Sequence, residues 1–156
     1  MSWIYQKWER ICYRCRQFWS ILFPEVDEQL WNEAVVCIPV RWQKAVAKLR
    51  PSEKAHILRL YKAIRADKTL KEEERRGLIT LALVHDIGKI VTKPGLIVRV
   101  VMTLLPVPKN SHPIMGVRIL RSLGASHCLL KRVRRHHEDP GTDQLLTKFQ
   151  MFDDAN

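Results

Sequence analysis

Histidine and aspartate stand side by side at His85 and Asp86, directly after the apolar run from Leu78 to Val84. Both side chains are good metal ligands, and Gly88 and Lys89 follow them almost at once. A neutral imidazole is buried at little cost, but a buried carboxylate has to be paired, hydrogen-bonded or bound to a metal. The pair therefore predicts a cation site at the end of a buried helix.

Further candidate ligands are spread over the rest of the chain. They are His56 upstream, and His112, His136, His137, Asp153 and Asp154 downstream. Imidazole and carboxylate donors suit Fe, Mn, Zn, Co or Ni and leave positions open for water and phosphate oxygens. Because the candidates are far apart in sequence, they can share a site only if several helices converge.

The order of these residues resembles a known superfamily. The series reads H…HD…H…HH…D, which is similar to the HD superfamily of metal-dependent phosphohydrolases, in the subgroup whose tetrad reads HDIG. The motifs that carry the resemblance are Leu83 to Lys89, Ser111 to Gly116, Arg135 to Glu138 and Phe152 to Asn156. The resemblance covers residues 51–156 and leaves residues 1–50 outside it.

The resemblance implies a ligand set for two divalent transition metals per chain. One metal is assigned to His56, His85, Asp86 and Asp153. The second is assigned to His112 and His136, with Asp86 bridging the pair. Asp153 is chosen over Asp154 because the family's last ligand is the first Asp after a small or apolar residue. His137 is either a further ligand or a group that supports one, and Glu138 is expected to orient an imidazole.

The resemblance also implies an activity. A metal-activated hydroxide would attack phosphorus in line, with Asp86 and Lys89 as the catalytic residues and Lys89 and Arg135 as the groups that hold phosphate. The expected enzyme is a phosphomonoesterase or phosphodiesterase for a nucleotide or another small phosphate ester. The alternative is a non-catalytic HD-domain protein that binds a nucleotide or regulates a partner. Such a protein could act at the membrane surface.

Composition indicates which partners to expect. The chain has 156 residues and a net charge of +11, which suggests an anionic partner, with a basic solvated surface as the alternative. Apolar runs are too short to span a bilayer, so a cytoplasmic protein is expected. The aromatic and basic segment 1–23 offers a peripheral membrane contact, nucleic acid is not an expected partner, and a homodimer is an alternative to a monomer.

Helical periodicity runs along nearly the whole chain and predicts an all-α HD-domain bundle. We expect one domain over residues 1–156, with residues 1–50 as an N-terminal helical cap and residues 51–156 as the core. Helices are predicted over 3–23, 26–38, 41–49 and 52–66, and then from a capping box at Thr69–Glu72 to a C′ glycine at Gly88. Ser111, Ser126 and Thr142 or Asp143 are expected to start three further helices.

Two other sets of residues carry predictions. The apolar segment Leu96–Leu105 is expected to pack over the site or in a subunit interface. The four cysteines predict reduced thiols rather than a disulfide framework. Cys12 and Cys15 are assigned to the apolar stripe of the first helix, and Cys37 and Cys128 to buried positions.

Overall fold

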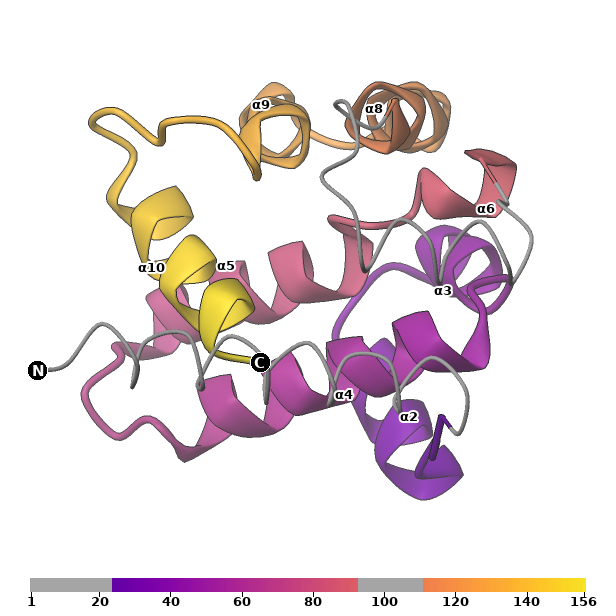
Figure 1. The fold of residues 1–156 in the computed structure, drawn as a ribbon, viewed down its shortest axis with the longest axis horizontal. Helices are drawn as coiled ribbons and strands as arrows, with labels where there is room; N and C mark the ends of the chain where they lie inside the picture. Colours follow the sequence, from indigo (N-terminus) through magenta and orange to yellow (C-terminus); the bar gives the residue numbers. More distant parts are fainter. Residues whose placement is uncertain (1–23, 93–110) are drawn as a thin grey trace, which may run out of the picture.

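The computed structural model describes residues 24–92 and 111–156 (Figure 1). Within these ranges all regular structure is helical and no strand is present, which confirms the all-α prediction. The helices are α2 (Glu28–Val35), α3 (Val40–Val46), α4 (Pro51–Ala66), α5 (Glu72–Val84), α6 (Lys89–Thr92), α8 (His112–Ser122), α9 (His127–Arg135) and α10 (Gln144–Ala155). The predictions for residues 3–23, for Cys12 and Cys15 and for Leu96–Leu105 lie outside the described residues.

Helices α4 and α5 form the centre of the bundle and run across the middle of Figure 1. Helix α4 begins with Pro51 in its first turn, and the carboxylate of Glu53 accepts a hydrogen bond from the N–H of Arg50 at 2.8 Å. Its buried residues follow the spacing of one helix face and include Ile57, Leu60, Tyr61 and Ile64. The second half of α5, from Leu78 to Val84, is buried almost all round, with Thr80 only partly so, as expected of a central helix.

The start of α5 differs from the prediction. Thr69 does not cap the helix, because its N–H and hydroxyl both bond to the carboxylate of Asp67, at 2.8 and 2.7 Å. The N-cap is Lys71 instead, and Glu74 accepts from its N–H at 3.2 Å. The predicted capping box was therefore wrong by two residues, since an Asx turn holds Thr69 before the helix begins.

Helices α8 and α9 lie side by side at the top of Figure 1, both viewed nearly end on, and α10 runs between this layer and the α4–α5 pair. Ser126 and Asp143 cap their helices as predicted, whereas Ser111 stands at the N-cap of α8 without a side-chain hydrogen bond to the helix. Gly124, with φ +71°, ends the α8 segment, and Ser126 accepts from the N–H of Leu129 at 3.4 Å to start α9. Asp143 accepts from the N–H of Leu146 at 3.1 Å and starts α10. These caps fix where the ends of α8, α9 and α10 lie.

Gly88 has a different role from the predicted helix C′ residue. Helix α5 ends at Val84 with His85 as its C-cap, and Gly88 does not have a positive φ. A Cβ atom at Gly88 would lie 1.9 Å from the carbonyl oxygen of His112 and 2.6 Å from the nitrogen of Gly116. Glycine is needed here because the backbone of α8 passes directly over it, which brings His112 beside the His85–Asp86 pair.

Two cysteine predictions were wrong. Cys37 and Cys128 are both exposed free thiols. The buried positions near Cys37 are taken by Ala34 and Ile38, and α9 buries Leu130 and Val133, which leaves Cys128 on a different side of that helix. Among the described helices, none is both long enough and apolar enough for a bilayer crossing.

Candidate metal centre

The six predicted ligands come from five elements whose ends or edges converge. His56 lies on α4, and His85 and Asp86 follow the last residue of α5. The remaining three are His112 at the start of α8, His136 at the C-cap of α9 and Asp153 near the end of α10. Four of the six side chains, His85, Asp86, His112 and His136, are at most 3% exposed, so the cluster lies inside the bundle rather than on its surface.

One group of ligand atoms joins α4, α5 and α10. The nearest ligand atoms of His56, His85 and Asp153 all lie within 4.8 Å of one another. The Nε2 atom of His56 is 2.9 Å from Oδ1 of Asp153, and Nε2 of His85 is 3.9 Å from the same oxygen. Three side chains from three helices thus aim their ligand atoms at one small volume.

A second group joins α8 and the turn after α9. The ligand atoms of His112, His136 and His137 also lie within 4.8 Å of one another. The Nε2 atom of His112 is 3.3 Å from Nε2 of His136 and 3.3 Å from Nε2 of His137. His137 is exposed, but its ring nitrogen lies in the same group of possible ligand atoms as those of His112 and His136.

Asp86 stands between the two groups and directs one carboxylate oxygen toward each. Its Oδ2 atom is 3.4 Å from Nε2 of His85, in the first group. Its Oδ1 atom is 3.2 Å from Nε2 of His112 and 3.9 Å from Nε2 of His136, in the second. Among the described residues, Oδ1 of Asp86 is the buried side-chain oxygen without a hydrogen bond. A cation beside this oxygen would compensate for its burial.

Backbone carbonyls set the protonation of two of the imidazoles. Nδ1 of His85 lies 2.9 Å from the carbonyl oxygen of Ala82, and Nδ1 of His136 lies 2.6 Å from that of Val133. A carbonyl oxygen only accepts hydrogen bonds, so Nδ1 carries the proton in both rings, and in the neutral imidazole Nε2 presents a lone pair. Each Nε2 lone pair faces an oxygen of the Asp86 carboxylate, and the two electron-rich atoms repel each other. A cation between the nitrogen and the oxygen would remove this repulsion. The donor set and its tautomers therefore fit a divalent metal in each group.

The electrostatics of the cluster keep its carboxylates ionised. Burial alone would raise the pKa of Asp86, but the Lys89 ammonium and His85 hold it well below its usual range. Burial also opposes ionisation of Asp153, yet its hydrogen bond to His56 and the nearby His85 lower its pKa to about 2. Both side chains are therefore available as anionic ligands at neutral pH.

The pKa values of the imidazoles shift in different directions, although the rings lie in one cluster. Burial lowers the pKa of His136 to about 3, with His85 and His137 adding to the effect, so its ring is neutral as a ligand must be. Burial and His112 lower the pKa of His137 in the same direction. Burial would also lower the pKa of His85, but Asp86 and Asp153 outweigh it and raise that pKa.

The predicted cationic groups lie at the edge of the cluster. Lys89 donates from Nζ to Oδ2 of Asp86, and its side chain is 34% exposed. Arg135 is engaged in its own loop, where it donates to the carbonyl of Asp139 and lies 3.9 Å from a carboxylate oxygen of Glu138. The Glu138 side chain thus lies beside Arg135, and its expected role in orienting an imidazole stays a prediction.

Helix α10 explains which of its two aspartates reaches the cluster. Leu146 and Phe149 are buried, and Asp153 follows them at the spacing of the same helix face. Asp154 is exposed. The apolar face of α10 therefore delivers Asp153 and turns its neighbour toward solvent.

Two residues that support the cluster were not anticipated from the sequence. The ring of Phe149 packs against His85 with centroids 5.1 Å apart. The side-chain amide of Gln150 donates to the carbonyls of His136 and Glu138, at 3.1 and 2.7 Å. Gln150 thus ties α10, which carries Asp153, to the turn that carries His136. No sequence signal marks it beyond its position one turn before Asp153.

Comparison with protein families agrees with this geometry. The family model described as HD domain matches residues 50–153, a segment that contains every ligand from His56 to Asp153. The chain belongs to the HD domain family. This family is all-helical and lies within a superfamily of metal-dependent phosphohydrolases. Comparisons with curated proteins and with solved structures gave no match.

Proposed function

We propose that this HD-domain protein is a phosphohydrolase that uses two divalent transition metals to cleave a nucleotide or another small phosphate ester. The observation that carries the proposal is the placement of Asp86, whose two carboxylate oxygens each face a separate group of ligands. A carboxylate shared in this way is the geometry expected of a bridging ligand between paired cations.

Each metal would be held by residues already described. His56, His85 and Asp153 would hold one, and His112, His136 and His137 the other, with Asp86 common to both. When bound, the cations supply a lowered pKa for water at the site and neutralise charge on phosphoryl oxygens. The bundle contributes rigidity, because the Nδ1 bonds of His85 and His136 keep their rings from turning.

Lys89 would contribute to phosphate binding. Its ammonium lies on Oδ2 of Asp86, the oxygen that faces the first group of ligands. Metal binding at this oxygen would release the ammonium, which is a third exposed and free to move toward a phosphate oxygen. The contact proposed for Arg135 requires its guanidinium to leave the carbonyl of Asp139.

The test is metal content together with hydrolysis of a panel of phosphomonoesters, phosphodiesters and nucleotides. Asp86→Asn is the informative variant, since it keeps the shape of the side chain and removes its charge. Asp154→Asn is the matched control, because it makes the same chemical change at an exposed aspartate outside the cluster. We expect wild type and the control to bind metal and hydrolyse at least one substrate, and Asp86→Asn to lose both properties.

The outcomes separate catalysis from regulation. Two metals per chain with no hydrolysis of any phosphate ester would contradict the enzyme and favour a regulatory HD domain that binds a nucleotide. Equal activity in Asp86→Asn and wild type would contradict the proposed role of the bridging carboxylate.

A further inference from the structure

The outer side of the α8–α9 layer carries cations without compensating acids. From Ser111 to His137 the sequence contains no aspartate or glutamate. Four basic side chains in this stretch are exposed: Arg118 and Arg121 on α8, and Lys131 and Arg134 on α9. Within residues 24–92 and 111–156, none of the four has an acidic partner, whereas Arg132 pairs with Asp143 at 2.9 Å.

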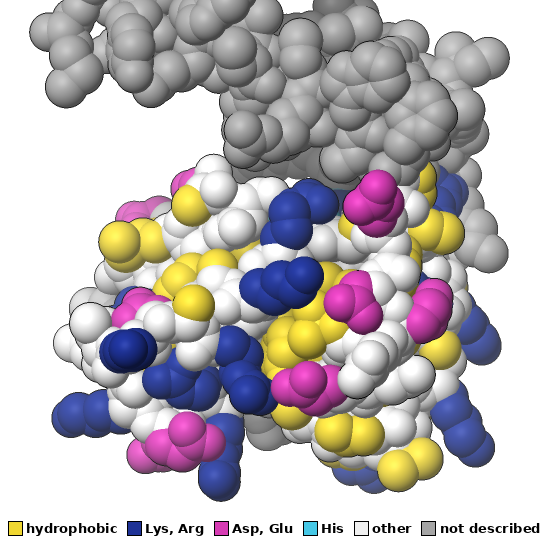
Figure 2. Space-filling model, turned by 90° about the horizontal axis from the view of Figure 1, so that it is seen from below, with side chains coloured by type: hydrophobic (Ala, Val, Ile, Leu, Met, Phe, Trp, Pro, Cys, Tyr) yellow, Lys and Arg dark blue, Asp and Glu magenta, His cyan; other side chains and the backbone are white. Residues whose placement is uncertain are grey.

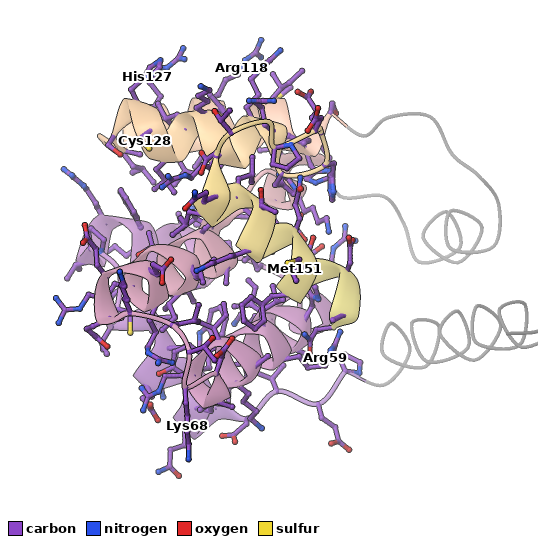
Figure 3. The ribbon with its side chains drawn as sticks, turned by 90° about the vertical axis from the view of Figure 1, so that its left-hand side faces the viewer. Arg59, Lys68, Arg118, His127, Cys128 and Met151 are labelled. Atoms are coloured by element: carbon purple, nitrogen blue, oxygen red, sulfur yellow. The ribbon has the colours of Figure 1, made fainter. Side chains whose placement is uncertain are left out.

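The four cations form two rows on one face. On α8, Ile114, Arg118 and Arg121 follow the spacing of one helix stripe, and on α9, His127, Lys131 and Arg134 do the same. Figure 3 shows Arg118 and His127 pointing the same way, outward from the α8–α9 layer, while Lys68 points out of the opposite side of the molecule. Each row extends about 10 Å along its helix. We call these residues the α8–α9 basic face.

This face differs in charge from the lower face of the molecule (Figure 2). The face seen from below in Figure 2 carries acidic and basic side chains in a mixture. The α8–α9 basic face is also separate from the metal centre, because α8 and α9 turn His112 and His136 inward and Arg118 and Lys131 outward. It therefore does not serve the hydrolytic site directly, and it presents a positive field to a larger anionic surface.

We propose that the α8–α9 basic face docks on an anionic lipid bilayer. Helices α8 and α9 pack side by side, so their exposed cations lie on neighbouring helices, and this concentration of positive charge complements the phosphate and carboxylate headgroups of an anionic bilayer. The face includes Ile114, an exposed apolar side chain 42% accessible, and it carries no Phe, Tyr or Trp ring and no amide side chain for reading base edges. These features favour a bilayer over a nucleic acid. The proposal is independent of the hydrolytic activity.

The test is co-sedimentation of the full chain with vesicles of phosphatidylcholine, with and without phosphatidylserine, at low and high salt. The informative variant replaces the four cations of the face with glutamine: R118Q/R121Q/K131Q/R134Q. The matched control removes four exposed lysines elsewhere: K44Q/K48Q/K62Q/K68Q. The two variants have the same net charge, so only the position of the charge differs. Circular dichroism confirms that both are folded.

We expect wild type to bind phosphatidylserine vesicles at low salt and to lose binding at high salt or without the anionic lipid. Each cation removed from the face should weaken binding about fivefold, so the first variant should lose several hundredfold, and the control only a few-fold. Equal loss in the two variants would overturn the proposal, because net charge alone would then explain binding. Tighter binding to duplex DNA or RNA than to vesicles, lost in the first variant, would also overturn it in favour of a nucleic acid.

Discussion

Replacing Gly88 by alanine tests how the fold positions the two groups of ligands. The new Cβ would lie 1.9 Å from the carbonyl oxygen of His112, and real Cβ atoms essentially never come closer than 3.0 Å to a heavy atom. Both clashing partners belong to the backbone of α8, so α8 would have to retreat by about 1 Å. Overpacking against side chains costs about 1–3 kcal/mol, and a backbone clash belongs at the upper end.

We therefore expect Gly88→Ala to destabilise the protein by about 3 kcal/mol, which for a chain of this size lowers the Tm by about 6–12 °C. The same retreat would carry His112 away from Asp86. Because metal ligands must be placed within about 0.2 Å, the second metal should be lost. The assay is thermal unfolding followed by circular dichroism in the presence of chelator, with metal content measured separately on the loaded protein.

Two comparisons make this prediction specific. Gly77→Ala is the matched control, because its Cβ would meet only the flexible side chain of Leu145 at 3.1 Å and alanine favours the helix. It should be neutral or stabilising. Gly88→Asn should be as damaging as Gly88→Ala, although asparagine tolerates a helix C′ position. Stability of Gly88→Ala within about 0.5 kcal/mol of wild type would refute the reasoning from close approach.

Three further predictions concern residues around the centre. Gln150→Leu removes two hydrogen bonds to the turn after α9, so the affinity for the second metal should fall about 10- to 100-fold, measured by competition with a chelator. Asp143→Asn keeps the cap of α10 but loses the ion pair with Arg132, which should cost about 0.5–1 kcal/mol at pH 7 in chelator-treated protein, measured by urea unfolding. Burial opposes ionisation of Asp143, but Arg132 holds its pKa below the usual 3.8, so this contribution is complete above that pH and disappears as the pH falls through the lower folded-state value. Lys89→Met should lower kcat/KM about 10- to 100-fold while both metals remain bound, since it removes a charged contact to phosphate.

Each of these predictions has a result that would contradict it. Unchanged metal affinity in Gln150→Leu would show that the turn is held by other contacts. A stability difference between Asp143→Asn and wild type that stays constant from pH 7 to well below pH 4 would exclude the ion pair as its cause. Loss of metal from Lys89→Met would assign the lysine to the metal centre instead of the substrate.

The metal centre was largely predictable because its residues are chemically distinctive. A buried carboxylate beside a histidine has few structural explanations, and the resemblance to the HD superfamily was enough to prefer Asp153 over Asp154. Which ligands group together around each metal position was not predictable in the same way. That His137 joins His112 depends on the turn after α9, whose path is set by Gln150 on another helix.

The predictions that were wrong have different physical causes. Thr69 fits a capping box better than Lys71, whose side chain cannot accept a hydrogen bond, but the carboxylate of Asp67 holds Thr69 in a turn before the helix. The role of Gly88 depends on α8, which begins 24 residues later, so no local pattern carries it. Cys128 was assigned by residue type, although the stripe of Leu130 and Val133 already excluded it from the buried face. Only at Gly88 did a contact between distant segments override the local sequence signal.

The most direct test of the central claim is a crystal structure of the metal-loaded protein with anomalous diffraction data collected at the absorption edge of the bound metal. The account predicts two anomalous peaks, one enclosed by His56, His85 and Asp153 and one by His112, His136 and His137, both within coordination distance of Asp86. A single peak, or peaks that Asp86 does not reach, would contradict the two-metal centre.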